Sequence, residues 1–444
     1  MFETLIRGAT VVNAEGVSHS DVGIAGGRIA ALIPPGEAVE AGNIIDASGS
    51  FLLPGLVDAH AHLRDPGLTH KEDFSSGTHA AALGGVTTVL DMPTDEPWTA
   101  TSGQLADKMA IAEGRIHVDV GLQAVVGRDL SHIPRLLDLA PVSFELFTAD
   151  VPDDFLFATL DVVTEALKAF GGADTTIGIS PGDQSILTGS TARDRSGTIA
   201  AFQASRPPLA EANGIARALF AAASTEARVH VRQINSGVGV ETWRRLHGMA
   251  DASVETTPQN LFFTAQDYEA QGAKLKASPP LRSPHDVDAL RAALSAGLID
   301  IVATDHAPHA PAEKAATYAA FADIPGGMPG LQTLLSTMLR LVDEGLIALP
   351  DLVRMGSRNP AERFGLGRRK GRIAAGYDAD LLILDRRQSS TIANADQVSR
   401  AGYTPFDGWA VKARPTSVFL RGREIVREGK LIGPSSGNIV TRES

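Results

Sequence analysis

The sequence predicts an α/β protein, a TIM-like (β/α)₈ barrel that carries a small β-sandwich domain. Short apolar runs, each followed by a helical stretch rich in Ala and Leu, recur along the middle of the chain. Both ends instead alternate apolar and polar residues between glycine-containing turns, which is typical of short strands. The 444 residues exceed the usual size of one domain, about 100–200 residues, unless that domain is a barrel.

The barrel prediction depends on the number and order of the candidate strands. The eight candidates are residues 56–61, 86–92, 118–126, 142–147, 175–180, 228–234, 252–257 and 300–304. Helical stretches lie between them, among them residues 158–170, 209–224 and 284–296. Alternating strands and helices favour either a closed barrel or an open, doubly wound sheet. We prefer the barrel because no GxGxxG motif follows an early strand.

Strand-like segments at the two ends predict one domain assembled from both termini. They are residues 5–14, 21–25, 28–33 and 43–47 at the start, and 380–384, 415–420 and 424–427 near the end. We therefore expect residues 1–54 and 365–444 to form a composite β-sandwich domain. Residues 55–364 should then form the barrel.

Composition excludes several classes of protein and of site. The chain has 52 Asp and Glu against 40 Lys and Arg, whereas nucleic acids and anionic membranes select a basic surface. The absence of Cys excludes disulfides, thiolate metal sites and a cysteine nucleophile. The sequence shows neither a signal-peptide pattern nor an apolar run of about 18 residues. We expect a cytoplasmic homo-oligomer that binds a small molecule, with no nucleic-acid or membrane partner.

A His-x-His pair ends the first predicted barrel strand. Barrel active sites lie at the C-terminal ends of the strands, which makes His60 and His62 the first candidates for functional residues. Side chains two residues apart in a strand point to the same side, so both imidazoles can ligate one metal ion. Asp305 follows the eighth strand, which lies beside the first in a closed barrel. A carboxylate there can bind the metal and also take a proton from water, which makes Asp305 the candidate catalytic residue.

Four segments of the sequence resemble a known family. PGLVDAHAHLRDPG, KEDFSSGTHAAALGGVTTVLDMP, SPPLRS and VATDHAPH are similar to motifs of the amidohydrolase superfamily, in its dihydroorotase, allantoinase and hydantoinase branch. The stretch Arg64-Asp65-Pro66-Gly67 looks most like dihydroorotase. The resemblance covers nearly the whole chain. The motifs are specific for the superfamily and much less so for the substrate.

This resemblance implies a hydrolase of cyclic amides with two divalent metal ions in the barrel mouth. One ion is held by the positions that correspond to His60, His62 and Asp305. Histidines of the fifth and sixth strands hold the other ion, and a carboxylated lysine of the fourth strand is shared between the two. In the family, a bridging hydroxide attacks the ring carbonyl and the aspartate passes its proton to the leaving nitrogen.

Three positions depart from the family pattern. Glu145 stands where the lysine is expected, Ser180 replaces the histidine of the fifth strand, and Gln233 replaces that of the sixth. A shifted register would bring His230 toward the site. However, His230 lies three residues too early and on the opposite face of the strand from Gln233.

These departures predict one metal ion in place of two. Two imidazoles from His60 and His62 and two carboxylates from Glu145 and Asp305 would balance one divalent cation, and the ligand number suits Zn²⁺. A single zinc ion is chemically sufficient because it lowers the pKa of its water from about 15.7 to about 7. An alternative for Glu145 stays open, a buried ion pair with Arg232.

Residues expected on the substrate side match dihydroorotase only in part. Arg64 and His309 match two contacts to the substrate carboxylate, and a guanidinium suits that task. The alternatives are a surface ion pair for Arg64 and a loop-capping role for His309. Thr94 and Ser278 stand where two asparagines are expected, and Gln259 replaces a histidine. We therefore expect these four substrate-binding residues, Arg64, His309, Thr94 and Ser278, to recognise a carboxylated ring other than dihydroorotate.

Three hypotheses for function remain at this point. The first is metal-dependent hydrolysis of a cyclic amide, imide or ureide. The second is a catalytically silent, dihydroorotase-like subunit that serves as an assembly partner. The third is a related hydrolase with another leaving group, such as a deaminase. The long polar stretch 181–196 is expected to be a loop over the barrel mouth.

Overall fold

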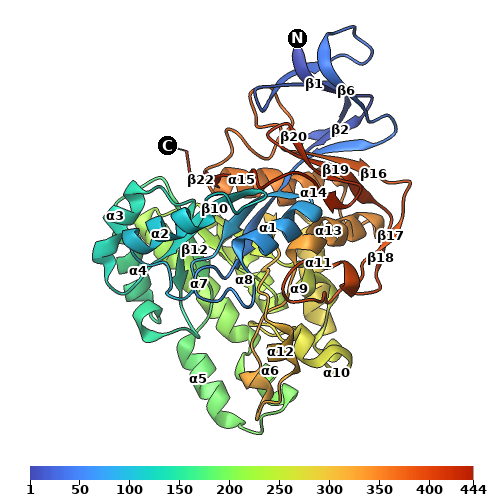
Figure 1. Cartoon of the computed structure of the whole chain (residues 1–444). Helices are drawn as coiled ribbons and strands as arrows, with labels where there is room; N and C mark the ends of the chain where they lie inside the picture. The colour runs from blue at the N-terminus through green and yellow to red at the C-terminus, as the bar shows by residue number, and fades with distance from the viewer. Residues whose placement is uncertain (444) are drawn as a thin grey trace.

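Eight parallel strands form a nearly closed barrel in the computed structural model, which describes residues 1–443 (Figure 1). They keep their chain order around the ring: β8 (Leu56–Ala61), β9 (Val86–Asp91), β10 (Asp119–Val125), β11 (Ser143–Phe147), β12 (Thr176–Ser180), β13 (Val229–Val231), β14 (Ala252–Thr256) and β15 (Ile301–Val302). A bridge between Ala61 and His306 joins the last strand to the first, and the His62 amide donates to the His306 carbonyl over 2.7 Å. The predicted barrel is confirmed.

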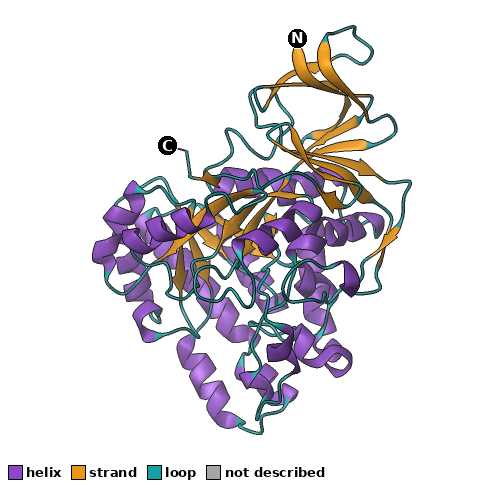
Figure 2. Cartoon of the chain, in the orientation of Figure 1, coloured by secondary structure: helices purple, strands orange, loops and turns teal. Residues whose placement is uncertain are grey.

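Helices cover the outside of this barrel, so the strands are buried on both faces (Figure 2). Strands in that position are nearly continuous apolar runs, which is why the sequence shows them clearly. The longer helices are α1 (Phe74–Leu83), α2 (Ser102–Ala112), α4 (Leu160–Lys168), α7 (Pro208–Thr225), α8 (Gly237–Leu246), α11 (Pro284–Ser295) and α13 (Leu334–Asp343). Shorter helices are α3 (Ile133–Asp138), α9 (Pro258–Phe262), α10 (Tyr268–Gln271), α12 (Pro311–Ala315), α14 (Leu349–Val353) and α15 (Asn359–Arg363).

The stretch 181–196 is expected from the sequence to be a loop, but the structure shows a helix in most of it. It contains α5 (Gln184–Arg193), which is followed by α6 (Ile199–Ser205). The Asp183 side chain accepts a hydrogen bond from the Ile186 amide over 2.9 Å and so caps the start of α5. Most of α5 is not buried, and a helix without an apolar stripe leaves little periodicity in the sequence.

Strands from both ends of the chain share one sheet, as predicted. This sheet has the order β21-β20-β19-β16-β7-β2-β3 and includes β2 (Thr10–Asn13), β3 (Gly16–His19), β7 (Phe51–Pro54), β16 (Leu381–Asp385), β19 (Arg414–Leu420), β20 (Arg423–Arg427) and β21 (Lys430–Leu431). A second sheet, β5-β4-β1-β6, contains β1 (Phe2–Arg7), β4 (Asp21–Ala25), β5 (Arg28–Ile33) and β6 (Ala41–Asp46). The single strand expected at 5–14 is split at Gly8, whose φ is +76°.

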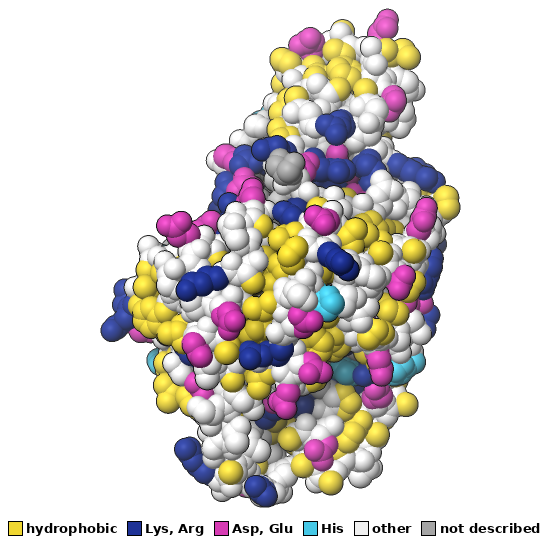
Figure 3. Space-filling model, turned by 90° about the vertical axis from the view of Figure 1, so that its left-hand side faces the viewer, with side chains coloured by type: hydrophobic (Ala, Val, Ile, Leu, Met, Phe, Trp, Pro, Cys, Tyr) yellow, Lys and Arg dark blue, Asp and Glu magenta, His cyan; other side chains and the backbone are white. Residues whose placement is uncertain are grey.

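The last strands show that the C-terminal segment does not lie wholly in the terminal sheets. β17 (Ser390–Thr391) pairs with β18 (Ala410–Val411), and β22 (Ile439–Val440) pairs with β10 of the barrel. The domain limits at 54 and 365 therefore stay a proposal. Figure 3 shows Lys and Arg side chains in a band between the smaller and larger lobes, with acidic side chains among them. No helix within residues 1–443 has both the length and the apolar character needed to cross a membrane.

Candidate metal centre

Three predicted ligand side chains converge at the C-terminal end of the barrel. His60 lies in β8, His62 directly follows it, and Asp305 follows β15. Oδ1 of Asp305 lies 3.3 Å from Nε2 of His60 and 3.4 Å from Nε2 of His62. One donor atom from each residue lies within 4.8 Å of the others. The three side chains thus surround one point, which is the geometry that the alternation along β8 predicts.

Hydrogen bonds on the far side of each imidazole orient the two rings. Nδ1 of His60 lies 2.5 Å from Oε1 of Glu255, so the ring donates its Nδ1 proton to that carboxylate and turns its Nε2 toward Asp305. Nδ1 of His62 bonds to the Thr94 hydroxyl over 2.8 Å. Burial lowers the pKa of His62 well below its usual value, so this ring is neutral, as a metal ligand has to be.

Asp305 is held by contacts of the residues on either side of it. Its φ is 46°, in the left-handed region. The Asp58 carboxylate accepts hydrogen bonds from the Thr304 amide over 3.0 Å and from the Thr304 hydroxyl over 2.5 Å. On the other side, Nε2 of His306 lies 3.2 Å from Oε2 of Glu72. Burial raises the pKa of Asp305 to about 7, a value suited to proton exchange near neutral pH.

Glu145 is paired with Arg232 and does not join the cluster. Nε of Arg232 donates to Oε2 of Glu145 over 3.0 Å, and the Ser180 hydroxyl donates to Oε1 over 2.8 Å. Both Glu145 and Arg232 are fully buried. Because both carboxylate oxygens already have partners, the prediction of Glu145 as a fourth metal ligand is replaced by its alternative, the ion pair.

Glu255 is a site residue that the sequence reasoning missed. Its Oε2 accepts from Nη1 of Arg232 over 3.2 Å and lies 2.9 Å from Nε2 of His230. Although burial favours the neutral acid, His60 and Arg232 hold the pKa of Glu255 well below its usual range. A signal for it existed, since Ser253 and Glu255 alternate with apolar residues along β14 and therefore point to one side.

His230 is a partner of Glu255 and not a member of the cluster. Its Nδ1 lies 2.7 Å from the Ser253 hydroxyl, and its Nε2 faces Glu255. Burial lowers the pKa of His230 to about 4, so the ring is neutral in the folded protein. This placement agrees with leaving His230 out of the predicted ligand set.

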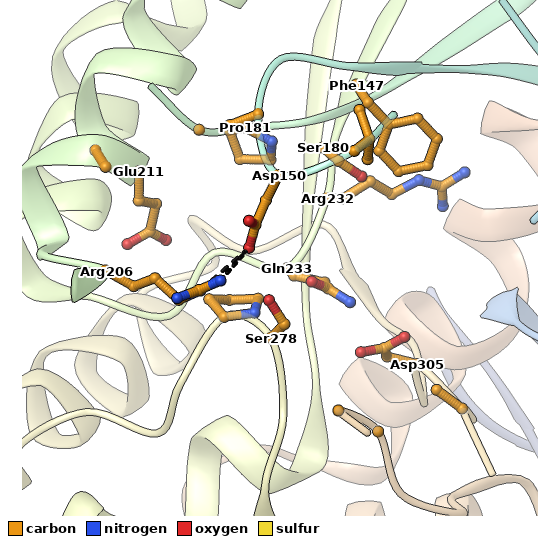
Figure 4. A pocket seen from close by; sticks show the side chains of 18 of the residues that line it. Phe147, Asp150, Ser180, Pro181, Arg206, Glu211, Arg232, Gln233, Ser278 and Asp305 are labelled. Carbon is orange, nitrogen blue, oxygen red and sulfur yellow. Dashed lines mark hydrogen bonds and ion pairs between the residues drawn. The ribbon is translucent and has the colours of Figure 1, made fainter. Parts of the chain in front are cut away.

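A cavity of about 300 Å³ opens over the cluster. In Figure 4, Asp305 lies on one side of this cavity and Arg206 and Glu211 lie on the other, with Gln233 between them. Arg206 is paired with Asp150, whose Oδ2 lies 2.6 Å from Nη2 of the arginine. The cavity therefore combines the cluster with a charged far wall.

Arg64 and Ser278 line this cavity, whereas Thr94 and His309 are not part of its lining. Nε of Arg64 is buried without a hydrogen-bond partner among the described residues. Nε2 of His309 donates to the Gly326 carbonyl over 2.9 Å, and burial lowers the pKa of His309 to about 3. Its Nδ1 is buried without a hydrogen-bond partner among the described residues and lies 3.7 Å from Oε2 of Glu313, so the contact of His309 with a substrate carboxylate stays a prediction. The Thr94 hydroxyl bonds to Nδ1 of His62, and its contact with substrate stays a prediction.

The donor set fits a divalent ion. Two imidazole nitrogens and one carboxylate oxygen, with a fourth position left for water or substrate, are typical of catalytic zinc sites. The described residues contain one other group of three side chains close enough to hold a metal ion, Asp119, Asp378 and Asp380. There the Lys370 ammonium lies 2.8 Å from Asp119 and 2.6 Å from Asp380, so an internal cation already neutralises that cluster.

The chain matches the profile of the amidohydrolase family over residues 51–128 and 236–425. It is 35% identical over 404 residues to the dihydroorotase of Methanothermobacter thermautotrophicus, which covers 89% of this chain and 88% of that protein. It is 33% identical over 451 residues to the allantoinase of Deinococcus radiodurans, which covers 100% of this chain and 99% of the relative.

Solved structures of similar proteins share the whole architecture. The L-hydantoinase (dihydropyrimidinase) from Arthrobacter aurescens superposes with a TM-score of 0.95 at 30% identity and covers 100% of both chains. A D-hydantoinase superposes with a TM-score of 0.91 at 27% identity, covering 100% of this chain and 99% of the other. The resemblance seen in the sequence motifs thus extends over the complete fold.

Proposed function

Because this chain belongs to the amidohydrolase family, we propose that it hydrolyses a C–N bond of a cyclic amide, imide or ureide. Relatives named dihydroorotase, allantoinase and L-hydantoinase support this reaction class. The observation that carries the proposal is the cluster of His60, His62 and Asp305 facing a cavity beside Arg64.

The proposed site holds one divalent ion, zinc, through His60, His62 and Asp305. A bound ion of this kind lowers the pKa of water and polarises a carbonyl group. Glu255 supports the proposal because it fixes the proton of His60 on Nδ1 and leaves Nε2 for the ion. Thr94 restrains the ring of His62 in the same way.

Asp305 is proposed to move the proton. As the water oxygen bonds to the ring carbonyl carbon, the Asp305 carboxylate accepts one of the water protons. It then passes that proton to the ring nitrogen while the C–N bond breaks. The product is an open chain with a new carboxyl group and a released N–H, so the atoms of one water molecule are accounted for.

Arg64 is proposed to bind an acidic group on the substrate. Its Nε is buried and unpartnered within residues 1–443, and a buried guanidinium that lacks a carboxylate partner favours an anion in the adjoining cavity. Ser278 adds a hydroxyl to the same cavity wall. We infer that the substrate is a carboxylated ring, and that it differs from dihydroorotate because Thr94 and Ser278 replace two expected asparagines.

Zinc content and product analysis together test this function. Purified protein supplied with Zn²⁺ is assayed against a panel of cyclic amides, imides and ureides, each with and without a carboxylate. Ring-opened product and about one zinc ion per chain are expected. No bound zinc after supplementation, together with no ring opening of any panel member, would favour the silent subunit. Release of ammonia without ring opening would favour a deaminase.

A further inference from the structure

Arg232 places one fully buried positive charge against the cavity at the C-terminal end of the barrel. It directly follows β13, lines the cavity, and donates to side chains on three other strands. Besides Glu145, Nη1 binds Oε2 of Glu255 over 3.2 Å and Nη2 binds Oε1 of Gln123 over 2.6 Å. Nη1 also donates to the Ala59 carbonyl of β8 over 3.0 Å. The guanidinium thus ties β8, β10, β11 and β14 to its own strand.

The structure leaves room for this guanidinium at Gly178 of β12, the strand between β11 and β13. A Cβ atom at this position would lie 2.1 Å from Oε2 of Glu145 and 2.9 Å from Nε of Arg232. Any side chain larger than hydrogen would therefore displace the pair. The space for the buried pair of Glu145 and Arg232 therefore depends on a glycine at position 178 of β12.

The contacts of Arg232 also reach the cluster above it. Glu255 accepts a hydrogen bond from Arg232 on Oε2 and one from His60 on Oε1. The guanidinium therefore helps to fix the carboxylate, and the carboxylate orients the imidazole. With Glu145 and Glu255 both bound by Arg232, their oxygens are not available to a second cation beside the cluster. The guanidinium balances one of these two carboxylate charges, and Ser180 and His60 bond to the remaining oxygens of Glu145 and Glu255.

We propose that Arg232 is a positioning residue that serves as the built-in cation of this site. It orients His60 through Glu255, and it limits the site to one metal ion by occupying Glu145 and Glu255. This inference rests on the proposed function, because it concerns the ion that His60, His62 and Asp305 would hold.

Zinc titration of the metal-free protein tests the proposal, with stoichiometry and affinity as readouts. The main variant is the double substitution Arg232→Met with Glu145→Gln, which removes both charges of the pair and so leaves no buried carboxylate at 145. We expect it to fold and to bind one zinc ion about 10–100-fold more weakly than the native chain, because Glu255 has lost its guanidinium partner and keeps only the two histidines, His60 and His230. Glu145→Gln alone should keep nearly native affinity.

The single variant Arg232→Met tests the limit on metal number. If it folds, it should take up a second zinc ion on the freed carboxylates of Glu145 and Glu255. A matched control is Arg228→Met, because Arg228 precedes the same strand and forms partly exposed ion pairs with Asp174 and Asp251. That control should bind one zinc ion with native affinity.

The outcomes separate this inference from the proposed function. Native affinity in the double variant, or two tight zinc ions in the native chain, would overturn the role of Arg232 while leaving cyclic amide hydrolysis intact. A native chain that binds no zinc and opens no ring would overturn the proposed function together with this inference.

Discussion

Asp305 combines a position in the cluster with a pKa near neutrality, so a change of this one side chain should affect turnover first. Asp305→Asn keeps the shape and removes the proton acceptor. We expect kcat to fall about 10²–10⁴-fold, the usual contribution of general acid–base catalysis. Steady-state kinetics with zinc content measured on the same sample would check this. Asp150→Asn, in the same cavity but paired with Arg206, is the control.

Arg64 should decide whether the enzyme prefers an acidic ring. A charged hydrogen bond contributes about 1.5–3 kcal/mol, so the carboxylated ring should be preferred by about tenfold or more in kcat/KM over its uncharged counterpart. Arg64→Met should remove most of that preference and leave hydrolysis of the uncharged ring largely intact. Arg206→Met is a suitable control because Arg206 already has Asp150 as a partner. A native preference for the uncharged ring would contradict this role.

Because His230 is buried and neutral, we expect the free energy of unfolding to decrease in acid. Burial holds the pKa of His230 at about 4, whereas an unfolded histidine has a pKa of about 6.5. Between these values the unfolded chain binds more protons, so stability falls as the pH drops from about 6.5 to 4, by up to roughly 3 kcal/mol. Urea unfolding across this range should show a shallower decline for His230→Gln. His132→Gln, at a half-exposed position, should behave like the native chain.

At the scale of elements, the strands of the barrel were the most predictable part. The observed β8 matches residues 56–61, and β14 and β15 lie within the predicted runs, because a strand buried on both faces is a continuous apolar segment. The missed helix α5 exposes most of its surface, so its sequence carries little periodicity. The local pattern of apolar residues in the sequence predicts buried elements better than exposed ones.

The same contrast explains which site residues the sequence could supply. His60, His62 and Asp305 lie at strand ends, where the order of the barrel strands alone brings them together. The partner of Glu145 in β11 is Arg232, which follows β13 and lies 87 positions later in the sequence, with β12 between the two strands. Nothing in the local pattern around Glu145 reports that distant contact, so its role stayed open until the structure placed Arg232 beside it.

Strand β12 gives a prediction about this contact. Gly178→Ala would place a methyl group 2.1 Å from Glu145, and the fully buried surroundings leave little room to adjust. We expect the free energy of unfolding to fall by about 1–3 kcal/mol, the usual cost of overpacking. Urea denaturation would measure it. Gly189→Ala in α5 meets nothing within 4 Å and should instead be neutral or stabilising, by up to about 1 kcal/mol.

At the scale of the whole molecule, one buried lysine joins the barrel to the terminal sheets. Lys370 binds Asp119 of β10 and Asp380, the residue before β16. The Asn438 amide, just before β22, also donates to Asp119 over 2.8 Å. Segments from three parts of the chain therefore meet at one set of charges. This arrangement accounts for the C-terminal strand returning to the barrel after the sheet is complete.

Metal binding should stabilise the whole chain if the proposed site is correct. A ligand at 100 times its Kd adds about 2.7 kcal/mol to the free energy of unfolding when it binds only the folded state. Thermal denaturation with and without Zn²⁺ should therefore show a higher Tm with the ion. His62→Ala should lose this shift, whereas His132→Gln should retain it. An equal shift in His62→Ala would place the bound zinc elsewhere.

The closure of the ring has a consequence for local opening. The last strand contributes two residues, and the segment after it meets the first strand through one bridge, the hydrogen bond from His62 to His306 and the hydrogen bonds from Thr304 to Asp58. His60 and His62 stand on one side of this junction and Asp305 on the other, so an ion held by all three would cross-link the two edges. Zinc binding would then slow amide hydrogen exchange far more at residues 61–63 and 304–307 than in strands β10, β11 and β12. Zinc binding and closure of the barrel between its first and last strands would then be coupled, so that each favours the other.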